Sequence, residues 1–138
     1  MTEVAGTGRR ILICEDDFLV AFTLRDNLRH HGYEILPIAP DGATAIALCR
    51  EHRPEVVLMD LRMPTMSGVE AARAILKECP TCVIIISAAP LQELEQALTE
   101  SGAIGYVRKP ITGEELVSSI EGACARWEAS ASPPCAGL

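Results

Sequence analysis

The chain has 138 residues, of which 49% are hydrophobic and 22% are charged, as in a single globular domain. Its formal net charge of −7 argues against non-specific nucleic-acid binding, which depends on Lys and Arg meeting phosphates. The apolar runs are far shorter than the roughly 20 residues that span a bilayer, and no basic start precedes an apolar block at the N-terminus. We therefore expect a cytoplasmic protein with no direct binding to nucleic acid or membranes.

Five β-rich runs alternate with helical segments along the chain. These runs are Ile11–Cys14, Glu34–Ile38, Val56–Met59, Val83–Ile86 and Ile104–Val107. Their starts are separated by 23, 22, 27 and 21 residues (11 to 34, 34 to 56, 56 to 83, 83 to 104), which fits one strand, one helix and two turns per unit. The spacing predicts an α/β fold with parallel strands joined by right-handed crossovers.

The composition of the runs predicts their order in the sheet. The first, third and fourth runs are apolar throughout, as expected for strands that are covered on both faces. Pro37 in the second run and Gly105 in the fifth favour edge positions, because both residues weaken a strand ladder. We therefore expect a five-stranded, doubly wound parallel sheet of order 2-1-3-4-5, a flavodoxin-like arrangement.

Local signals mark the ends of several helices. Ser67 with Glu70 and Thr112 with Glu115 match the capping box, while Asp17 is in place to cap the first helix. Gly32 follows a cation-rich turn and suits a left-handed helix end. We place the domain at residues 9–128 and expect flexible tails at residues 1–8 and 129–138, which are small and lack periodicity.

The cysteines give little indication of a metal or redox site. Cys79 and Cys82 form a C-x-x-C pair, but no second ligand pair accompanies it and a strand, not a helix, follows it. The other cysteines of the predicted elements are expected to pack as small hydrophobic residues. We therefore assign no function to Cys79 and Cys82 from the sequence.

Polar side chains gather where four of the predicted strands end. They are Glu15, Asp16 and Asp17 after the first strand, Asp60 after the third, Ser87 after the fourth and Lys109 just past the fifth. In an open parallel sheet these ends meet where the strand order reverses, which is where ligands bind. Clustered carboxylates repel one another unless a cation holds them, and Mg²⁺ prefers such oxygen ligands. Asp60 is a candidate nucleophile, with Ser87 and Lys109 available to contact an added oxyanion.

Four motifs in this order resemble the receiver domain of two-component response regulators, from about Arg10 to Trp127. They are ILICEDD (11–17), VVLMDLRMPTMSGVEAA (56–72), VIIISA (83–88) and GYVRKP (105–110). The resemblance implies that Asp60 is the phosphoacceptor, assisted by Ser87 and Lys109. It implies a Mg²⁺ site formed by Glu15, Asp16 and Asp60 with the backbone carbonyl of Arg62, in which Asp16 is the more direct ligand of the acidic pair.

Other implications of the resemblance concern the switch and the partners. Ser87 and Tyr106 match the family's switch residues, and the bond before Pro110 is usually cis in the family. The phosphoryl donor is expected to be a sensor histidine kinase or a histidine phosphotransfer protein. Output to an unidentified protein target is expected through the fourth helix, the fifth strand and the fifth helix of a monomer or weak dimer. We also hypothesise that the guanidinium of Arg62 contacts the phosphoryl group or a neighbouring carboxylate.

Three other functions remain as alternatives. A flavodoxin-like electron carrier needs a phosphate-binding loop after the first strand, where Glu15, Asp16 and Asp17 would repel the phosphate. A phosphatase of the dehalogenase type needs a D-x-D motif at that place and a longer chain. A pseudo-receiver, which binds partners without being phosphorylated, is the nearest alternative, and the presence of Asp60, Ser87 and Lys109 argues against it. The expected role is therefore a signalling phosphoacceptor that is not an enzyme in the usual sense.

Overall fold

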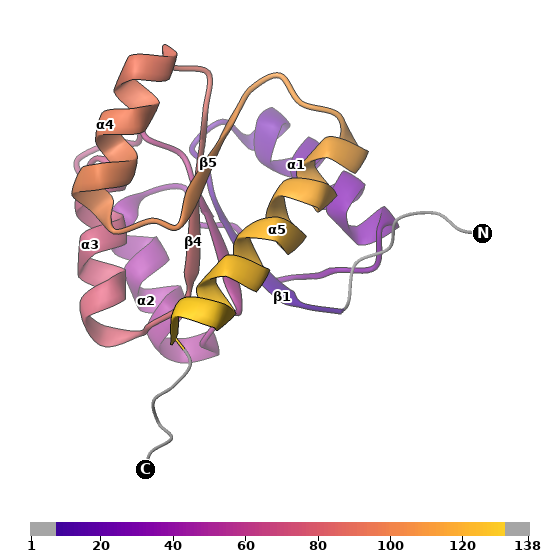
Figure 1. Ribbon diagram of the computed structural model, residues 1–138, viewed down its shortest axis with the longest axis horizontal. Coiled ribbons are helices and arrows are strands. Elements are labelled where there is room, and N and C mark those ends of the chain that lie inside the picture. The colour runs from indigo at the N-terminus through magenta and orange to yellow at the C-terminus, as the bar shows by residue number, and fades with distance from the viewer. Residues whose placement is uncertain (1–7, 132–138) are drawn as a thin grey trace.

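The computed structural model describes residues 8–131, in which strands alternate with helices (Figure 1). The strands are β1 (Arg10–Cys14), β2 (Glu34–Ile35), β3 (Val56–Met59), β4 (Cys82–Ser87) and β5 (Gly105–Arg108). The helices are α1 (Phe18–His30), α2 (Gly42–His52), α3 (Gly68–Glu78), α4 (Leu91–Ser101) and α5 (Gly113–Ala131). The predicted alternation is therefore confirmed.

The strands form one parallel sheet in the order β2-β1-β3-β4-β5, as predicted. β2 is shorter than expected, because it ends at Ile35, two residues before Pro37, which has no N–H to donate to the ladder. Past β2, the N–H of Leu36 still donates to the carbonyl of Ile11 at 2.9 Å, and Ala39 forms an isolated bridge with Cys14. β5 begins at Gly105 and lies at the other edge of the sheet.

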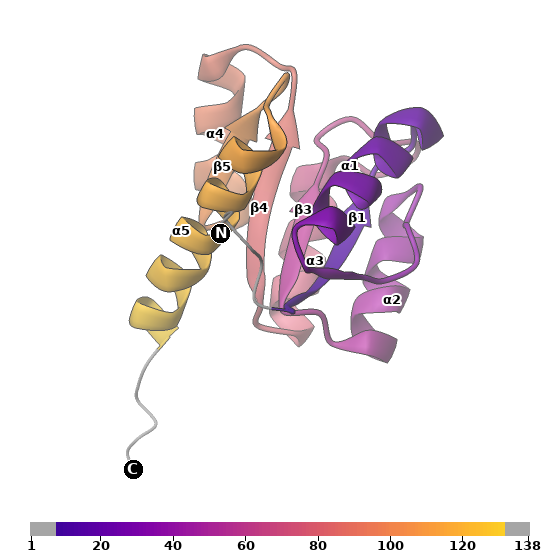
Figure 2. The same ribbon diagram turned by 90° about the vertical axis from the view of Figure 1, so that its right-hand side faces the viewer.

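Helices cover both faces of the sheet: α2, α3 and α4 lie on one side and α1 and α5 on the other (Figure 1), and α1 and α5 are nearest the viewer in Figure 2. Residues of α1 and α5 share one hydrophobic cluster with Ile11 and Ile13 of β1. Residues of α2, α3 and α4 share a second cluster with Leu12 and Cys14 of the same strand. Because alternate residues of a strand face opposite sides, both sets must be apolar, which explains the continuous apolar runs.

The helix ends use the predicted residues. Ser67 Oγ accepts a 3.2 Å hydrogen bond from the N–H of Glu70, whose side chain accepts 3.1 Å from the N–H of Ser67. Thr112 and Glu115 make the same reciprocal pair at 3.1 and 3.0 Å. Asp17 caps α1 by accepting from Leu19 and Val20, and Gly32 has a φ of 93° just after α1.

The C-terminal helix is longer than the sequence predicted. α5 continues through residues 129–131, which were expected to belong to the C-terminal tail. The rest of both predicted tails, residues 1–7 and 132–138, lies outside the described residues. Among the helices from residue 8 to residue 131, none is both long and apolar enough to cross a membrane.

Candidate functional site

Backbone hydrogen bonds continue past the ends of the strands and position the candidate site. The N–H of Asp60 donates to the carbonyl of Cys14 at 3.0 Å, and the N–H of Glu15 donates to the carbonyl of Ala39 at 2.9 Å. Where β4 and β5 end, the N–H of Lys109 donates to the carbonyl of Ser87 at 2.9 Å. The first residues after the strands are therefore held by the sheet itself, although they belong to loops.

The sheet brings three carboxylates together at its carboxyl edge. Oxygen atoms of Glu15, Asp16 and Asp60 lie within 4.8 Å of one another, as the sequence predicted. Asp60 is only 7% exposed and Glu15 only 3%, whereas Asp16 is exposed. Burial of Asp60, followed by the charge of Glu15 and a hydrogen bond between the two side chains, raises the pKa of Asp60 to about 6. The cluster is therefore short of positive charge.

Lys109 supplies one cation to this cluster. Its Nζ donates a 2.8 Å hydrogen bond to Oε1 of Glu15, and its charge lowers the pKa of Asp60, against the effect of burial. An ammonium group has three N–H donors, so it can contact Glu15 and another oxygen at once. Lys109 therefore neutralises part of the acidic cluster and keeps the capacity to bind an anion.

The hydroxyl of Ser87 lies at the end of β4, where the side chain is 3% exposed. Its Oγ accepts a 3.2 Å hydrogen bond from the N–H of Ala89. The oxygen acts as the acceptor in this bond, so the O–H remains a donor for a further group. Ser87 is thus suited to contact an oxyanion.

A cavity of about 260 Å³ joins these side chains. Its lining residues are Asp60, Arg62, Ser87, Ala88, Ala89, Pro90 and Lys109. A nucleophile candidate, a hydroxyl donor and an ammonium thus face one space, which is the arrangement that the sequence predicted. Tyr106 is not among the lining residues; it is half-buried on β5 and packs against the cluster that includes α2, α3 and α4.

The side chain of Arg62 points to α4. Its Nη2 donates to both carboxylate oxygens of Glu93, at 3.1 and 3.2 Å. The neighbouring carboxylate in our hypothesis is therefore that of Glu93, which is not one of the three clustered carboxylates. No sequence signal pointed to Glu93, because it lies far from Arg62 in the chain and its helical pattern is that of an ordinary solvated face.

Gly68 is a second residue whose importance the sequence did not reveal. A Cβ atom at this position would overlap the carbonyl oxygen of Asp60 and lie 2.9 Å from the Cα of Leu61. The N–H of Gly68 also donates a 2.9 Å hydrogen bond to the carbonyl of Leu61. The absence of a side chain therefore lets α3 begin directly against the backbone of Asp60. The Ser-Gly pair at the start of the helix was the only available signal.

The peptide bond between Lys109 and Pro110 is cis. This agrees with what the resemblance implied, and the bond lies directly after the residue that contacts Glu15.

Comparison with known proteins identifies the family. Residues 11–121 match the model of the response regulator receiver domain. The chain belongs to this family. The receiver domains of two-component systems are signalling phosphoacceptors, and they interact with histidine kinases or phosphotransfer proteins and with downstream targets.

Individual relatives agree with this assignment. Protein PilH of Pseudomonas aeruginosa is 36% identical over 80% of this receiver chain and 93% of its own length. The transcriptional regulatory protein PdtaR of Mycobacterium tuberculosis is 35% identical over 89% of this chain, which spans only 60% of that relative. The signal receiver domain of a modulated diguanylate cyclase from Desulfovibrio desulfuricans G20 superposes with a TM-score of 0.80 at 30% identity, covering 88% of this chain and 98% of its own.

The residues at the acidic cluster fit the Mg²⁺ site that the family possesses. All ligand candidates are oxygen atoms, which suit a hard cation. Burial and then repulsion by Glu15 raise the pKa of Asp60, and the charge of Lys109 offsets only part of this effect. A divalent cation at this position would relieve that repulsion.

Proposed function

We propose that this receiver accepts a phosphoryl group on Asp60 from a phosphohistidine of a sensor histidine kinase or a histidine phosphotransfer protein. The observation that carries the proposal is the cavity in which Asp60, Ser87 and Lys109 meet beside two further carboxylates. The domain that does this is proposed to span residues 9–128. It is a phosphoacceptor and switch, not a conventional enzyme.

Mg²⁺ would be held by the carboxylates of Asp16 and Asp60 and the backbone carbonyl of Arg62, with Glu15 close by. When bound, the ion supplies positive charge that offsets the charge of the transferring phosphoryl group. Binding requires ionised carboxylates, so protonation of Asp60 below its pKa of about 6 opposes it.

The chain's own side chains perform the remaining steps. A carboxylate oxygen of Asp60 attacks phosphorus in line with the leaving imidazole, so that a P–O bond forms while the P–N bond breaks. The imidazole nitrogen keeps the electron pair of the broken bond. Lys109 pairs with one phosphoryl oxygen through its remaining N–H donors, and the hydroxyl of Ser87 donates to another. Later attack by water returns Asp60 to its free form.

Phosphorylation is proposed to shift the receiver between two conformations. Contacts from Ser87 and Lys109 to the phosphoryl group would stabilise a state in which Tyr106 turns inward on β5. The output surface then consists of α4, β5 and α5, and it binds a protein target. The receiver itself is proposed to be a monomer or weak dimer. The net charge of −7 supports a protein partner over nucleic acid.

The phosphoryl donor is proposed to dock on the exposed apolar start of α1. Phe18 is 58% exposed, Leu19 76% and Phe22 42%, which is unusual for large apolar side chains that sit together. Leu19 also lines an apolar groove of about 400 Å³ that reaches Lys109. A helical donor seated there would lie beside the cavity that contains Asp60.

The central test is the intact mass of the protein after incubation with acetyl phosphate and Mg²⁺. We expect the addition of one phosphoryl group in the wild type and none in Asp60→Ala. Asp26→Ala, an exposed carboxylate on α1, is the matched control and should be phosphorylated normally. Failure of both acetyl phosphate and a phosphohistidine donor would overturn the proposal in favour of a pseudo-receiver.

The docking surface has its own test. Leu19→Ser should slow phosphotransfer from a phosphohistidine protein but leave phosphorylation by acetyl phosphate unchanged. Leu91→Ser, which alters a 47% exposed leucine on α4, should affect neither reaction. Equal slowing by both variants would contradict docking on α1.

A further inference from the structure

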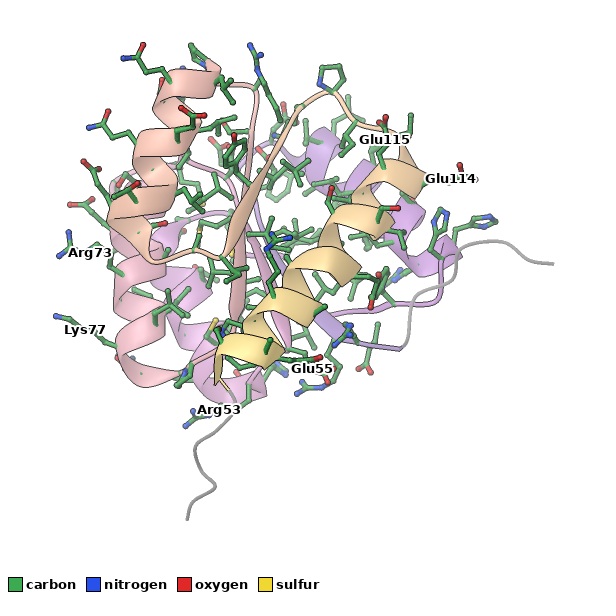
Figure 3. All side chains as sticks on the ribbon, viewed as in Figure 1. Arg53, Glu55, Arg73, Lys77, Glu114 and Glu115 are labelled. Atoms are coloured by element: carbon green, nitrogen blue, oxygen red, sulfur yellow. The ribbon has the colours of Figure 1, made fainter. Side chains whose placement is uncertain are left out.

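A second cavity lies at the amino ends of the strands, whereas the acidic cluster lies at their carboxyl ends. It has a volume of about 220 Å³, and its wall includes Arg9, Glu55, Cys82, Cys124, Trp127 and Glu128. Cys82 begins β4 at this cavity, whereas Ser87 ends the same strand at the cavity that contains Asp60. In Figure 3, Glu55 of the cavity wall lies well away from Glu114 and Glu115 at the start of α5. This cavity is therefore separate from the proposed phosphorylation site.

Two thiols meet in the wall of this cavity. Cys82 begins β4 and is 1% exposed, and Cys124 lies on α5 and is 2% exposed. Both belong to the hydrophobic cluster between the sheet and α1 with α5, and both line this one cavity. The cavity gives a small molecule a route to sulfur atoms that the packing otherwise shields.

The pair is not the C-x-x-C motif seen in the sequence. Cys79 lies in the cluster on the other face of the sheet, where its thiol contacts the carbonyl of Cys49 at 3.8 Å. Cys14 and Cys49 belong to that other cluster as well. Among the cysteines that the structure describes, the sheet thus separates Cys82 and Cys124 from the remaining ones.

The charges around the pair make the two sulfurs unequal. The neighbouring thiol of Cys82 lowers the pKa of Cys124, and the charge of Arg9 lowers it further, against the effect of burial. The thiol of Cys124 and burial raise the pKa of Cys82. Arg9 is held beside them by ion pairs with Glu121 at 3.0 Å and Glu128 at 3.2 Å. These directions favour the thiolate form of Cys124 over that of Cys82.

We propose that Cys82 and Cys124 form an oxidisable dithiol site, which a small peroxide such as hydrogen peroxide converts to a disulfide. The thiolate of Cys124 attacks one peroxide oxygen; an S–O bond forms, the O–O bond breaks, and the departing hydroxide takes a proton to become water. The sulfur of Cys82 then attacks that of Cys124; the S–S bond forms, the S–O bond breaks, and a second water leaves with the proton of Cys82. Two electrons pass from the sulfurs to the peroxide.

The disulfide would connect β4 to α5, two elements that already pack together (Figure 1). It would close a loop that contains α4 and β5, and such a crosslink restricts the unfolded chain. Oxidation should therefore raise the temperature of unfolding. Because the chemistry does not use Asp60, Asp60→Ala should form the same bond.

The test is to treat the reduced, folded full chain with hydrogen peroxide, alkylate the remaining thiols, and map the crosslinked peptides by mass spectrometry. We expect a Cys82–Cys124 disulfide as the main product, with the loss of two hydrogen atoms and a higher unfolding temperature that a dithiol reductant reverses. A different disulfide as the main product, or only oxygenated cysteines, would overturn the proposal.

Two comparisons separate the native geometry from chance pairing. The urea-unfolded chain should give several different disulfides when it is oxidised in the same way, since the pairing of cysteines then depends only on their separation along the chain. Cys124→Ala should abolish the product, and Cys79→Ala should retain it. If Cys124→Ala fails to fold, the wild-type map and the Cys79→Ala map still decide, because both require Cys82–Cys124 to dominate.

Discussion

Lys109 and Glu15 form a 2.8 Å ion pair that joins the loop after β5 to the residue after β1. The glutamate is buried, with only 4% of its side chain exposed, whereas 22% of the lysine side chain is exposed. The cation that we propose to meet the phosphoryl group therefore already balances a buried carboxylate. Its removal should affect the stability of the protein as well as the chemistry at Asp60.

Lys109→Ala should lower the free energy of unfolding by about 1–3 kcal/mol at neutral pH, because it leaves Glu15 buried without its partner. Urea denaturation measures this change. Lys77→Ala is the control; this side chain points away from α3 into solvent (Figure 3), and its loss should change stability by about 0.5 kcal/mol or less. The double variant Lys109→Ala with Glu15→Gln should recover part of the loss. Equal effects of the two lysine substitutions would contradict this account.

Asp60→Asn should stabilise the protein at neutral pH and lose this effect in acid. The folded-state pKa of Asp60 is about 6, above its ordinary value of 3.8. The folded chain thus binds the proton more tightly than the unfolded chain, so the wild type loses stability as the pH rises from about 4 to about 6. The amide removes this loss, worth about 1–2 kcal/mol after allowance for solvent screening.

Unfolding temperatures of both proteins without Mg²⁺, measured across this pH range, test the relationship. The difference should be near zero below the ordinary pKa and constant above the raised one. Asp26→Asn, which changes an exposed carboxylate, should show no such transition. A difference that is independent of pH would rule out the raised pKa of Asp60 as its cause.

The sequence predicted the sheet and the main site because both depend on local patterns. Apolar runs at regular spacing determine the strands, and Pro37 and Gly105 mark the edges. Once the order is known, residues that directly follow β1 and β3 must be neighbours, so the meeting of Glu15 with Asp60 could be foreseen.

Contacts between side chains distant in sequence could not be foreseen in the same way. Arg62 pairs with Glu93, and Cys82 lines one cavity with Cys124. Both arrangements depend on how a helix is rotated against its neighbour. The C-x-x-C spacing gave no indication of Cys124, and the sequence analysis assigned no function to Cys79 and Cys82. Cys79 follows the end of α3 and packs in the cluster beneath that helix, whereas Cys82 begins β4 and packs in the cluster beneath α1 and α5, which their separation alone did not reveal.

Gly68→Ala should destabilise the protein by about 1–3 kcal/mol or more, because the added methyl group overlaps the backbone carbonyl of Asp60. The acceptor loop must then move, so phosphorylation by acetyl phosphate should also slow.

Gly122→Ala is the matched substitution: its Cβ would meet Arg126 only at 3.7 Å, within α5. It should stabilise the protein by about 0.5–1 kcal/mol, as expected for Ala in place of Gly in a helix. Chemical denaturation of both variants measures the contrast, and a destabilised Gly122→Ala would refute the role assigned to crowding at Gly68.

The ion pair between Arg62 and Glu93 should contribute little to stability but connect the acceptor loop to α4. Its side chains are 70% and 44% exposed, so a double-mutant cycle with Arg62→Ala and Glu93→Gln should give a coupling of about 0.2–1 kcal/mol. High salt should reduce this coupling, because both groups are in water.

We expect Arg62→Ala to change the rate at which the phosphorylated chain loses its phosphoryl group, since Arg62 lines the same cavity as Asp60. Identical dephosphorylation rates for the wild type and Arg62→Ala, followed by intact mass over time, would show that the guanidinium acts only on α4.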